Sequence, residues 1–313
     1  MQAVPPPSTR SSPAKTAPVL KSLKGIRILS LALNLPGPAA LMRCRELGAR
    51  CVKLEPPPPP HASAHASGDP MSQYNPTAYA ALHEGIRLRV ADLKTDSGQR
   101  ALHRELARAD VLLTSFRPSA LARLGLGWKA LHRQYPLLGQ VAIVGAPGAA
   151  AEEPGHDLTY LAKNDLITGL DLPATLYADM GGSLMATQAV LQAVMHKAAK
   201  GTGVYVEVAL SAAATWLALP RAWGLTKPGA AVGGGHAGYR VYPCRDGRVA
   251  VAALEPHFAA RLCEAAGIEG FSPAAMSSAA THERIAAFLL TQTRRQLDRL
   301  ASVADLPLHT LSK

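Results

Sequence analysis

The sequence has little of what metal sites, disulfide frameworks and membrane spans require. It contains only four cysteines in 313 residues, and none of them forms a C-x-x-C pair or stands at finger-like spacing from a histidine: Cys44, Cys51, Cys244 and Cys263. This spacing argues against a metal centre and a disulfide framework, and it favours a reducing cytoplasm as the location. The apolar run over residues 209–220 is shorter than the roughly 18–20 residues of a membrane span, so no membrane partner is expected.

Acidic residues are almost absent from the start of the chain. Residues 1–50 contain eight Lys or Arg and one acid, Glu46, and so carry seven of the eleven net positive charges. Aromatic residues make up only 5% of the chain, and no segment alternates basic with aromatic side chains as a nucleic-acid surface would. The charge therefore fits a phosphorylated small-molecule substrate better than a nucleic acid. Residues 1–22, rich in Pro and Ser and free of acids, are predicted to be a disordered basic tail.

The rest of the sequence alternates apolar strand patterns with amphipathic helix patterns. Strands are predicted at residues 26–31, 50–54, 87–92, 110–114 and 204–210, and helices at 38–47 and 96–107. Such alternation is typical of an α/β fold with a doubly wound parallel sheet, which we expect over residues 23–225 as a Rossmann-like domain. Residues 226–313 are expected to form a smaller α+β domain, with short strands at 239–243 and 249–253 and helices at 256–266 and 282–300.

Three short segments place an ionisable side chain beside glycine or proline. They are Gly155-His156-Asp157, residues 178–182 around Asp179, and Leu254-Glu255-Pro256. Helices are predicted to begin at these points, over residues 155–167, 182–197 and 256–266. A histidine and two carboxylates brought together would make a proton-transfer site. Each also has a simpler interpretation: one surface histidine among eleven, a helix cap, and an acid in a first helical turn.

An ordered series of short motifs extends over most of the chain. It includes residues 23–31 with Pro36-Gly37-Pro38, then Leu47-Gly48-Ala49, residues 52–55 and Gly68-Asp69-Pro70. It continues with residues 92–94 and 109–112, Phe116-Arg117-Pro118, residues 124–127, residues 179–182 and Gly201-Thr202-Gly203. From Gly25 to about Leu308 the chain thereby resembles the family III CoA-transferases, which include CoA-transferases and α-methylacyl-CoA racemases.

Within this family, the segments around His156 and Glu255 resemble the racemase branch. The resemblance implies 1,1-proton transfer at the carbon next to an acyl-CoA thioester, with His156 and Asp179 as the two bases and Glu255 as the support of the imidazole. It implies that CoA is part of the substrate, that no cofactor is tightly bound and no metal is used, and that the protein is a homodimer. CoA contacts are expected from Arg117, Arg87 and Lys53. Backbone amides near Asp157, Gly181 and Gly182 are expected to stabilise an enolate oxygen.

The sequence also departs from the family pattern. Residues 83–87 read His-Glu-Gly-Ile-Arg where the family has a basic Arg-Gly-Lys stretch, Lys163-Asn164-Asp165 replaces a small Ser-Gly pair, and the chain is expected to be C-terminally short. Two alternatives stay open. One is a CoA-transferase that uses Asp179 as a nucleophile, and the other is a non-catalytic binding protein that retains the fold.

Overall fold

The computed structural model describes residues 20–61 and 66–312. The tail predicted over residues 1–22 lies almost entirely outside the described residues. The chain divides into two compact units, one ending at Leu217 and the other beginning at Ala218. The boundary predicted from the sequence lies a few residues later, between residues 225 and 226.

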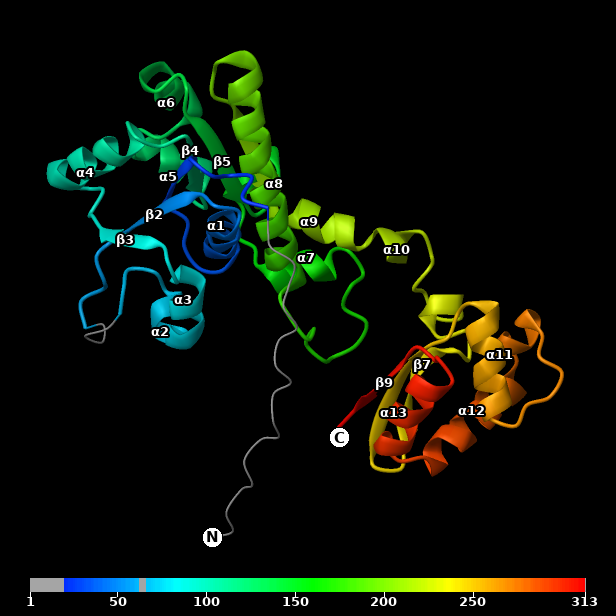
Figure 1. Cartoon of the computed structure of the whole chain (residues 1–313). Helices are drawn as coiled ribbons and strands as arrows, with labels where there is room; N and C mark the ends of the chain where they lie inside the picture. The colour runs from blue at the N-terminus through cyan, green and yellow to red at the C-terminus, as the bar shows by residue number, and fades with distance from the viewer. Residues whose placement is uncertain (1–19, 62–65, 313) are drawn as a thin grey trace, which may run out of the picture. The chain divides into compact units, whose positions relative to one another are not determined.

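The first unit is built on a six-stranded sheet, shown in Figure 1. The strand order is β3-β2-β1-β4-β5-β6, and every neighbouring pair is parallel. The strands are β1 (Arg27–Ser30), β2 (Arg50–Glu55), β3 (Arg87–Val90), β4 (Val111–Thr114), β5 (Gly139–Val144) and β6 (Tyr205–Ala209). The predicted doubly wound α/β fold is therefore confirmed.

Helices cover both faces of this sheet because side chains alternate across each strand. Ile28 packs in the core beneath α1 (Pro36–Glu46) and α8 (Tyr177–Lys200), whereas its neighbour Leu29 packs in the core on the other face. That second face carries α4 (Asp96–Leu106), α5 (Pro118–Arg123) and α6 (Trp128–Gln134). Shorter elements complete the unit: α2 (Met71–Tyr74), α3 (Pro76–His83), a 3₁₀ turn η1 (Gly148–Glu152), α7 (Asp157–Ala162) and α9 (Leu210–Leu217).

Strand β3 lies at the edge of the sheet and is less protected than the other strands. All four of its residues are exposed, and they alternate in character as Arg87, Leu88, Arg89 and Val90. By contrast, every residue of β4 and β5 is buried. The hydrophobic core of the unit is therefore centred on the inner strands.

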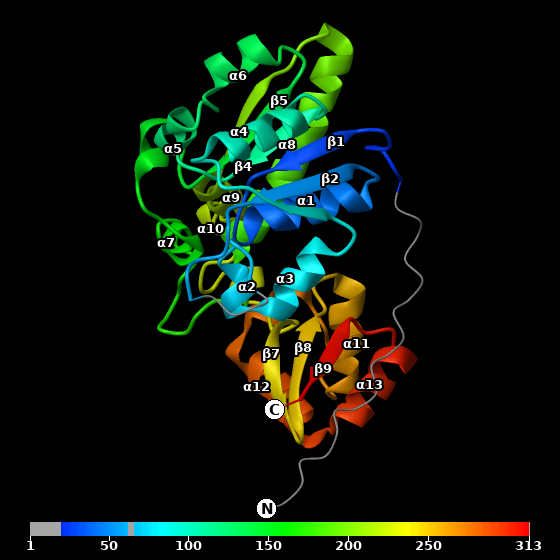
Figure 2. The ribbon, with the colours of Figure 1, turned by 90° about the vertical axis from the view of Figure 1, so that its left-hand side faces the viewer.

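The second unit contains a three-stranded antiparallel sheet of order β7-β8-β9. Its strands are β7 (Tyr239–Cys244), β8 (Gly247–Ala252) and β9 (Leu308–Leu311), shown in Figure 2. Its helices are α10 (Leu219–Ala222), α11 (Pro256–Ala265), α12 (Ala279–Thr291) and α13 (Arg294–Val303), with 3₁₀ turns η2 (Ala231–Gly233) and η3 (Pro273–Ser277). One apolar core joins this sheet to α11, α12 and α13. Among the described helices of both units, none has the length and apolar character needed to cross a membrane.

Several predicted boundaries are wrong. Helix α8 begins at Tyr177 rather than at residue 182, and α7 ends at Ala162 rather than at 167. The single helix predicted over 282–300 is two helices, because Thr293 caps the start of α13 and forms a capping box with Gln296. Strands β5 and β9 were not predicted.

Candidate active site

The loops that follow β1, β4 and β5 meet where the strand order reverses. In open parallel sheets, the crevice outside the carboxyl ends of the strands at such a reversal is the usual place for a ligand. The loop after β1 is joined there to the loop after β4, because the backbone N–H of Leu33 donates to the Ser115 hydroxyl at 3.0 Å. A cavity of about 790 Å³ opens at this point, lined by these loops together with residues of α2, α7 and α8.

Helix α7 presents His156 to this cavity. His156 is the N-cap of the helix and has an extended backbone. The Thr159 hydroxyl accepts the His156 backbone N–H at 3.1 Å and donates to the His156 carbonyl at 2.8 Å. This pair of bonds fixes the backbone of His156, whose side chain is exposed and lines the cavity.

Asp179 lines the same cavity from the first turn of α8. It is the third residue of the helix, so the interpretation of Asp179 as an N-cap is wrong; the N-cap is Leu176. The Asp179 backbone N–H donates at 3.0 Å to the carboxylate of Asp157, which is only 4% exposed. This bond joins the start of α8 to the start of α7, and it holds His156 and Asp179 on two elements that are tied to each other.

The pKa of Asp179 is strongly perturbed. Burial, and to a lesser extent the negative charge of Asp157, raises the pKa to about 6, and the charge of His156 opposes this change. A carboxyl group whose pKa lies this close to neutrality can both accept and return a proton near physiological pH. The site therefore has the electrostatic character of an acid–base centre.

Some of the cavity wall was not predicted from the sequence. The turn after β1 contributes Asn34, which has a left-handed backbone (φ 64°), and α2 contributes Tyr74. Tyr160 is buried in the cavity wall, and its hydroxyl lies close to Gly145 and Gly155. A Cβ atom at Gly145 would lie 2.3 Å from the Tyr160 hydroxyl oxygen, and one at Gly155 would lie 2.5 Å from it, so only glycine leaves room for this hydroxyl. The available signal was topological, since loops after the carboxyl ends of parallel strands line such crevices.

Of the residues expected to contact CoA or the enolate, some line the cavity and others lie elsewhere. Arg117, the N-cap of α5, is exposed and lines the cavity. Arg87 begins β3 and lines a different pocket, formed by the first residues of β1 to β3 with the end of α4. Gly181 and Gly182 lie in the second turn of α8 and not at its start, so their amides are within the helix. They allow close packing instead, since a Cβ atom at Gly182 would lie 2.3 Å from a methyl carbon of Leu210.

Lys53 is buried rather than available to a ligand. Its side chain is 0% exposed and forms ion pairs with Glu55 and Asp69. Together with His83, these two acids form a set of ligand-type atoms within 4.8 Å of one another, the donor set in the described residues that could suit a metal ion. The structure does not bring Lys53 to the lining of the cavity.

Glu255 lies in the second unit as the N-cap of α11. It is exposed, and its carboxylate makes no hydrogen bond within the part of the chain that the structure describes. The four cysteines, all within the described residues, are buried and free.

Comparison with known proteins identifies the family. Residues 23–313 match CoA-transferase family III. The α-methylacyl-CoA racemase of Mus musculus is 30% identical over 276 residues, which are 82% of this chain and 68% of that protein. The cinnamoyl-CoA:phenyllactate CoA-transferase of Clostridium sporogenes is also 30% identical, over 59% of this chain and 52% of that protein. This chain thus spans about half to two thirds of these curated relatives.

The solved structures support the same fold. A hypothetical protein of Mycobacterium tuberculosis superposes with a TM-score of 0.77 at 22% identity, over 94% of this chain and 86% of that one. The family match over nearly the whole described chain agrees with this likeness of fold. The chain belongs to CoA-transferase family III.

Proposed function

We propose that this protein is an α-methylacyl-CoA racemase-type isomerase, which moves a proton at the carbon next to an acyl-CoA thioester. The observation that carries the proposal is that His156 and Asp179 line one cavity and Asp179 has a pKa of about 6. The similarity to racemases over 82% of the chain supports it. CoA is then part of the substrate, and we propose no tightly bound cofactor.

The proposed reaction needs two groups on opposite sides of one carbon. One base removes the proton next to the thioester carbonyl and leaves an enolate, and the protonated partner returns a proton to the other face. Each positioned group contributes about 10²–10⁴-fold. Because Asp157 holds the Asp179 backbone and Thr159 holds the His156 backbone, the two bases are set on fixed supports.

Charge that develops on the substrate needs donors. The backbone N–H of Asp157, the first residue of α7, has no partner inside its helix and is our candidate donor to the enolate oxygen. Arg117 is our candidate contact for a CoA phosphate, because its exposed guanidinium lines the cavity and can bind phosphate in a bidentate manner.

Glu255 is proposed to support the imidazole of His156. A homodimer is part of this proposal. One face of α8 supports it, since Leu184 and Met195 are 62% and 69% exposed and lie three turns apart on the same side of the helix. Four free cysteines support a cytoplasmic location.

The alternative function is CoA transfer, and the similarity to a CoA-transferase at 30% identity favours it. The Asp179 carboxylate would attack the acyl-CoA carbonyl and expel the CoA thiolate, giving a mixed anhydride. The thiolate would then attack the aspartyl carbonyl, releasing the free acid and leaving an aspartyl-CoA thioester. This route makes no use of an imidazole at position 156.

Incubating the protein with a 2-methylacyl-CoA in deuterium oxide separates these functions. The isomerase predicts loss of the proton signal at the 2-position in NMR, with at least about 100-fold slower exchange in His156→Ala and in Asp179→Asn. His309→Ala, at an exposed histidine of β9, is the control and should exchange normally. CoA transfer to an added acid that needs Asp179 but not His156 would establish the transferase, and binding without either reaction would establish a non-catalytic protein.

A further inference from the structure

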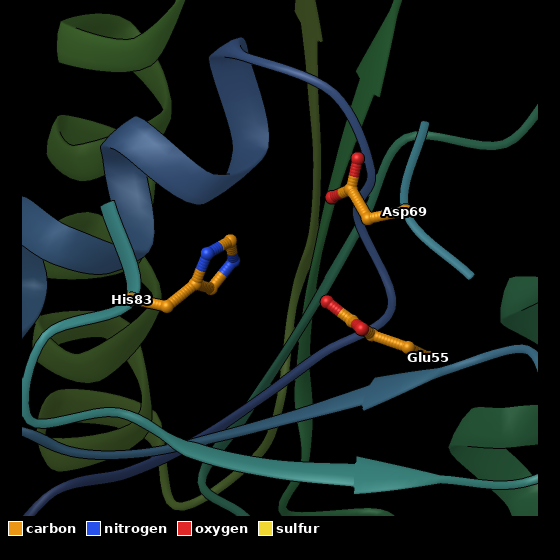
Figure 3. Close-up of side chains that lie close together, drawn as sticks. All are labelled: Glu55, Asp69 and His83. Carbon is orange, nitrogen blue, oxygen red and sulfur yellow. The ribbon is translucent and has the colours of Figure 1, made fainter. Parts of the chain in front are cut away.

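A buried group of charges lies behind the cavity, centred on the ammonium of Lys53. Three acceptor side chains surround it, and we call Glu55, Asp69 and His83 the Lys53 cage. The Lys53 Nζ lies 2.8 Å from Glu55 Oε1 and 2.8 Å from His83 Nε2, and it also donates to Asp69 Oδ2. Figure 3 shows the three cage side chains converging on a common space. Lys53 and Asp69 are fully buried, and Glu55 is 2% exposed.

The hydrogen bonds fix the protonation of the cage. An ammonium has three N–H donors and no acceptor, so three acceptors satisfy it completely. His83 Nε2 must therefore accept, and its Nδ1–H donates to the Tyr79 carbonyl at 2.6 Å. This tautomer is neutral, which agrees with a His83 pKa that burial and the charge of Lys53 lower. The Tyr79 hydroxyl donates to the carboxylate of Glu55 and lies 3.0 Å from each of its two oxygens.

The cage has the composition of a cation site. One imidazole and two carboxylates, with ligand atoms within 4.8 Å of one another, are ligands that zinc accepts. The Lys53 ammonium stands among them at hydrogen-bonding distance. The position that a divalent cation would take is filled by a positive charge from the chain itself.

The cage is connected to the wall of the cavity through Asp69. While one Asp69 oxygen binds Lys53, the other accepts the backbone N–H groups of Asn34 at 3.1 Å and of Met71 at 3.0 Å. Both Asn34 and Met71 line the cavity. Asn34 has a left-handed backbone, which asparagine tolerates better than most other residues, and its N–H is held by the Asp69 carboxylate.

We propose that Lys53 is a built-in cation that takes the place of a metal ion in the Glu55–Asp69–His83 cage, and that it acts as a positioning residue for the cavity wall at Asn34 and Met71. The first part depends only on the contacts of the cage. The second part rests on the proposed function, because it concerns how the cavity holds its substrate.

Replacing the ammonium with a neutral group of similar length tests the first part. Lys53→Met leaves the three cage ligands facing an uncharged thioether. We expect this variant to bind one Co²⁺ or Zn²⁺ per chain with micromolar affinity, seen as cobalt d–d absorption and as a melting temperature that rises with zinc. Wild type and Lys129→Met, at an exposed lysine of α6, should show neither effect, and Lys53→Met with His83→Gln should lose both.

The second part is tested by restoring the missing charge. We expect Lys53→Met without metal to exchange the substrate proton at least tenfold more slowly, mainly through kcat, and to regain most of that rate when zinc is added. Asp69→Asn, which keeps an acceptor for Asn34 and Met71, should retain more activity than Asp69→Ala, so these variants decide the second part if Lys53→Met does not fold without metal.

Two results would overturn the first part of the proposal, and a third would overturn the second part. Cobalt binding by wild type that disappears in His83→Gln would show that Lys53 does not fill the cation position. A Lys53→Met variant that folds but binds no metal would disprove the cage as a cation site. Metal binding without recovery of the exchange rate would refute the positioning role alone. If wild type exchanges no proton, the proposed function fails while the metal titration still decides the first part.

Discussion

At the scale of single residues, Asp179 determines how the proposed reaction should depend on pH. Its carboxyl pKa is raised to about 6, and a base must be deprotonated to remove a proton. We therefore expect kcat/KM for proton exchange to fall about tenfold per pH unit below pH 6, because only the deprotonated fraction acts. Initial exchange rates from pH 4.5 to 8 test this. A rate that stays constant down to pH 4.5 would contradict the role of Asp179.

The same residue should lower the stability of the fold at neutral pH. A raised carboxyl pKa means that the folded state binds the proton more tightly than the unfolded state between pH 3.8 and about 6. Stability is then lost as pH rises through this interval and stays lower above it. Asp179→Asn should remove this cost, and we expect it to stabilise the protein by about 1–3 kcal/mol at pH 7.5 while abolishing exchange.

Urea denaturation at pH 7.5 and at pH 4 measures the effect of Asp179→Asn. The increase in the free energy of unfolding caused by Asp179→Asn should be smaller at pH 4, where the wild-type carboxyl group is already protonated. Asp171→Asn, at an exposed position, is the matched control and should leave the free energy of unfolding unchanged at both values. An Asp179→Asn variant less stable than wild type at pH 7.5 would disprove the interpretation.

Residues also mark the limit of what the sequence could predict about the site. His156, Asp157, Asp179 and Arg117 do line the cavity, and the motifs that contain them gave the signal. Lys53 was expected to contact CoA, yet it is buried. Glu55 is two residues along the same strand, but Asp69 and His83 are 16 and 30 positions away, so most of its surroundings depend on how the chain folds back.

At the scale of elements, α8 depends on close packing against α9. A Cβ atom at Gly182 would lie 2.3 Å from a methyl carbon of Leu210. Alanine is the better helix former by about 1 kcal/mol, but overpacking costs about 1–3 kcal/mol. We expect Gly182→Ala to be neutral to destabilising by up to about 2 kcal/mol and to slow exchange, because α8 carries Asp179.

Thermal unfolding and exchange rates of Gly182→Ala test this expectation. Gly169→Ala is the control, because a Cβ atom at Gly169 would meet nothing within 4 Å. A clear rise in the melting temperature of Gly182→Ala would show that α9 moves aside and that the glycine is not needed for packing.

Some helices and strands were predicted closely from the sequence, and others were missed. Strand β2 and helix α1 agree with the predictions to within two residues, because an apolar run is bounded there by Pro36 and Gly48. Strand β5 was missed although all six of its residues are buried. A fully buried strand has no polar–apolar alternation and no distinctive period, so the pattern identified the equally buried β4 but not β5. The break between α12 and α13 was missed because the capping box of Thr293 and Gln296, which lies in the polar segment 291–296, was not identified as the start of a helix.

At the scale of the whole molecule, the exposed face of α8 leads to a prediction about assembly. Leu184 and Met195 lie on one side of this helix, while Ala186 and Val190 are buried on another. A charged side chain placed in an apolar interface loses its hydration when the interface forms, which is unfavourable. Leu184→Glu with Met195→Glu should therefore convert the proposed homodimer into monomers. Light scattering after size-exclusion chromatography measures the mass.

The two substitutions, Leu184→Glu and Met195→Glu, should leave the melting temperature of the monomer nearly unaltered, because both side chains are already exposed in the single chain. Gln188→Glu lies on the same exposed side of α8 and replaces a polar residue, so it is a milder control that should keep more of the dimer. A wild-type protein that is monomeric at micromolar concentration would contradict the assembly outright.

The exposed edge strand β3 of the six-stranded sheet has a consequence for solubility. Among the residues that the structure describes, no strand pairs with the outer side of β3, and its exposed Leu88 and Val90 would favour pairing with the same strand of a second molecule. The arginines at 87 and 89 oppose this, because two copies brought edge to edge would set like charges against each other. We expect that replacing both arginines with threonine makes the purified protein form ordered fibrils on storage, detectable by thioflavin fluorescence.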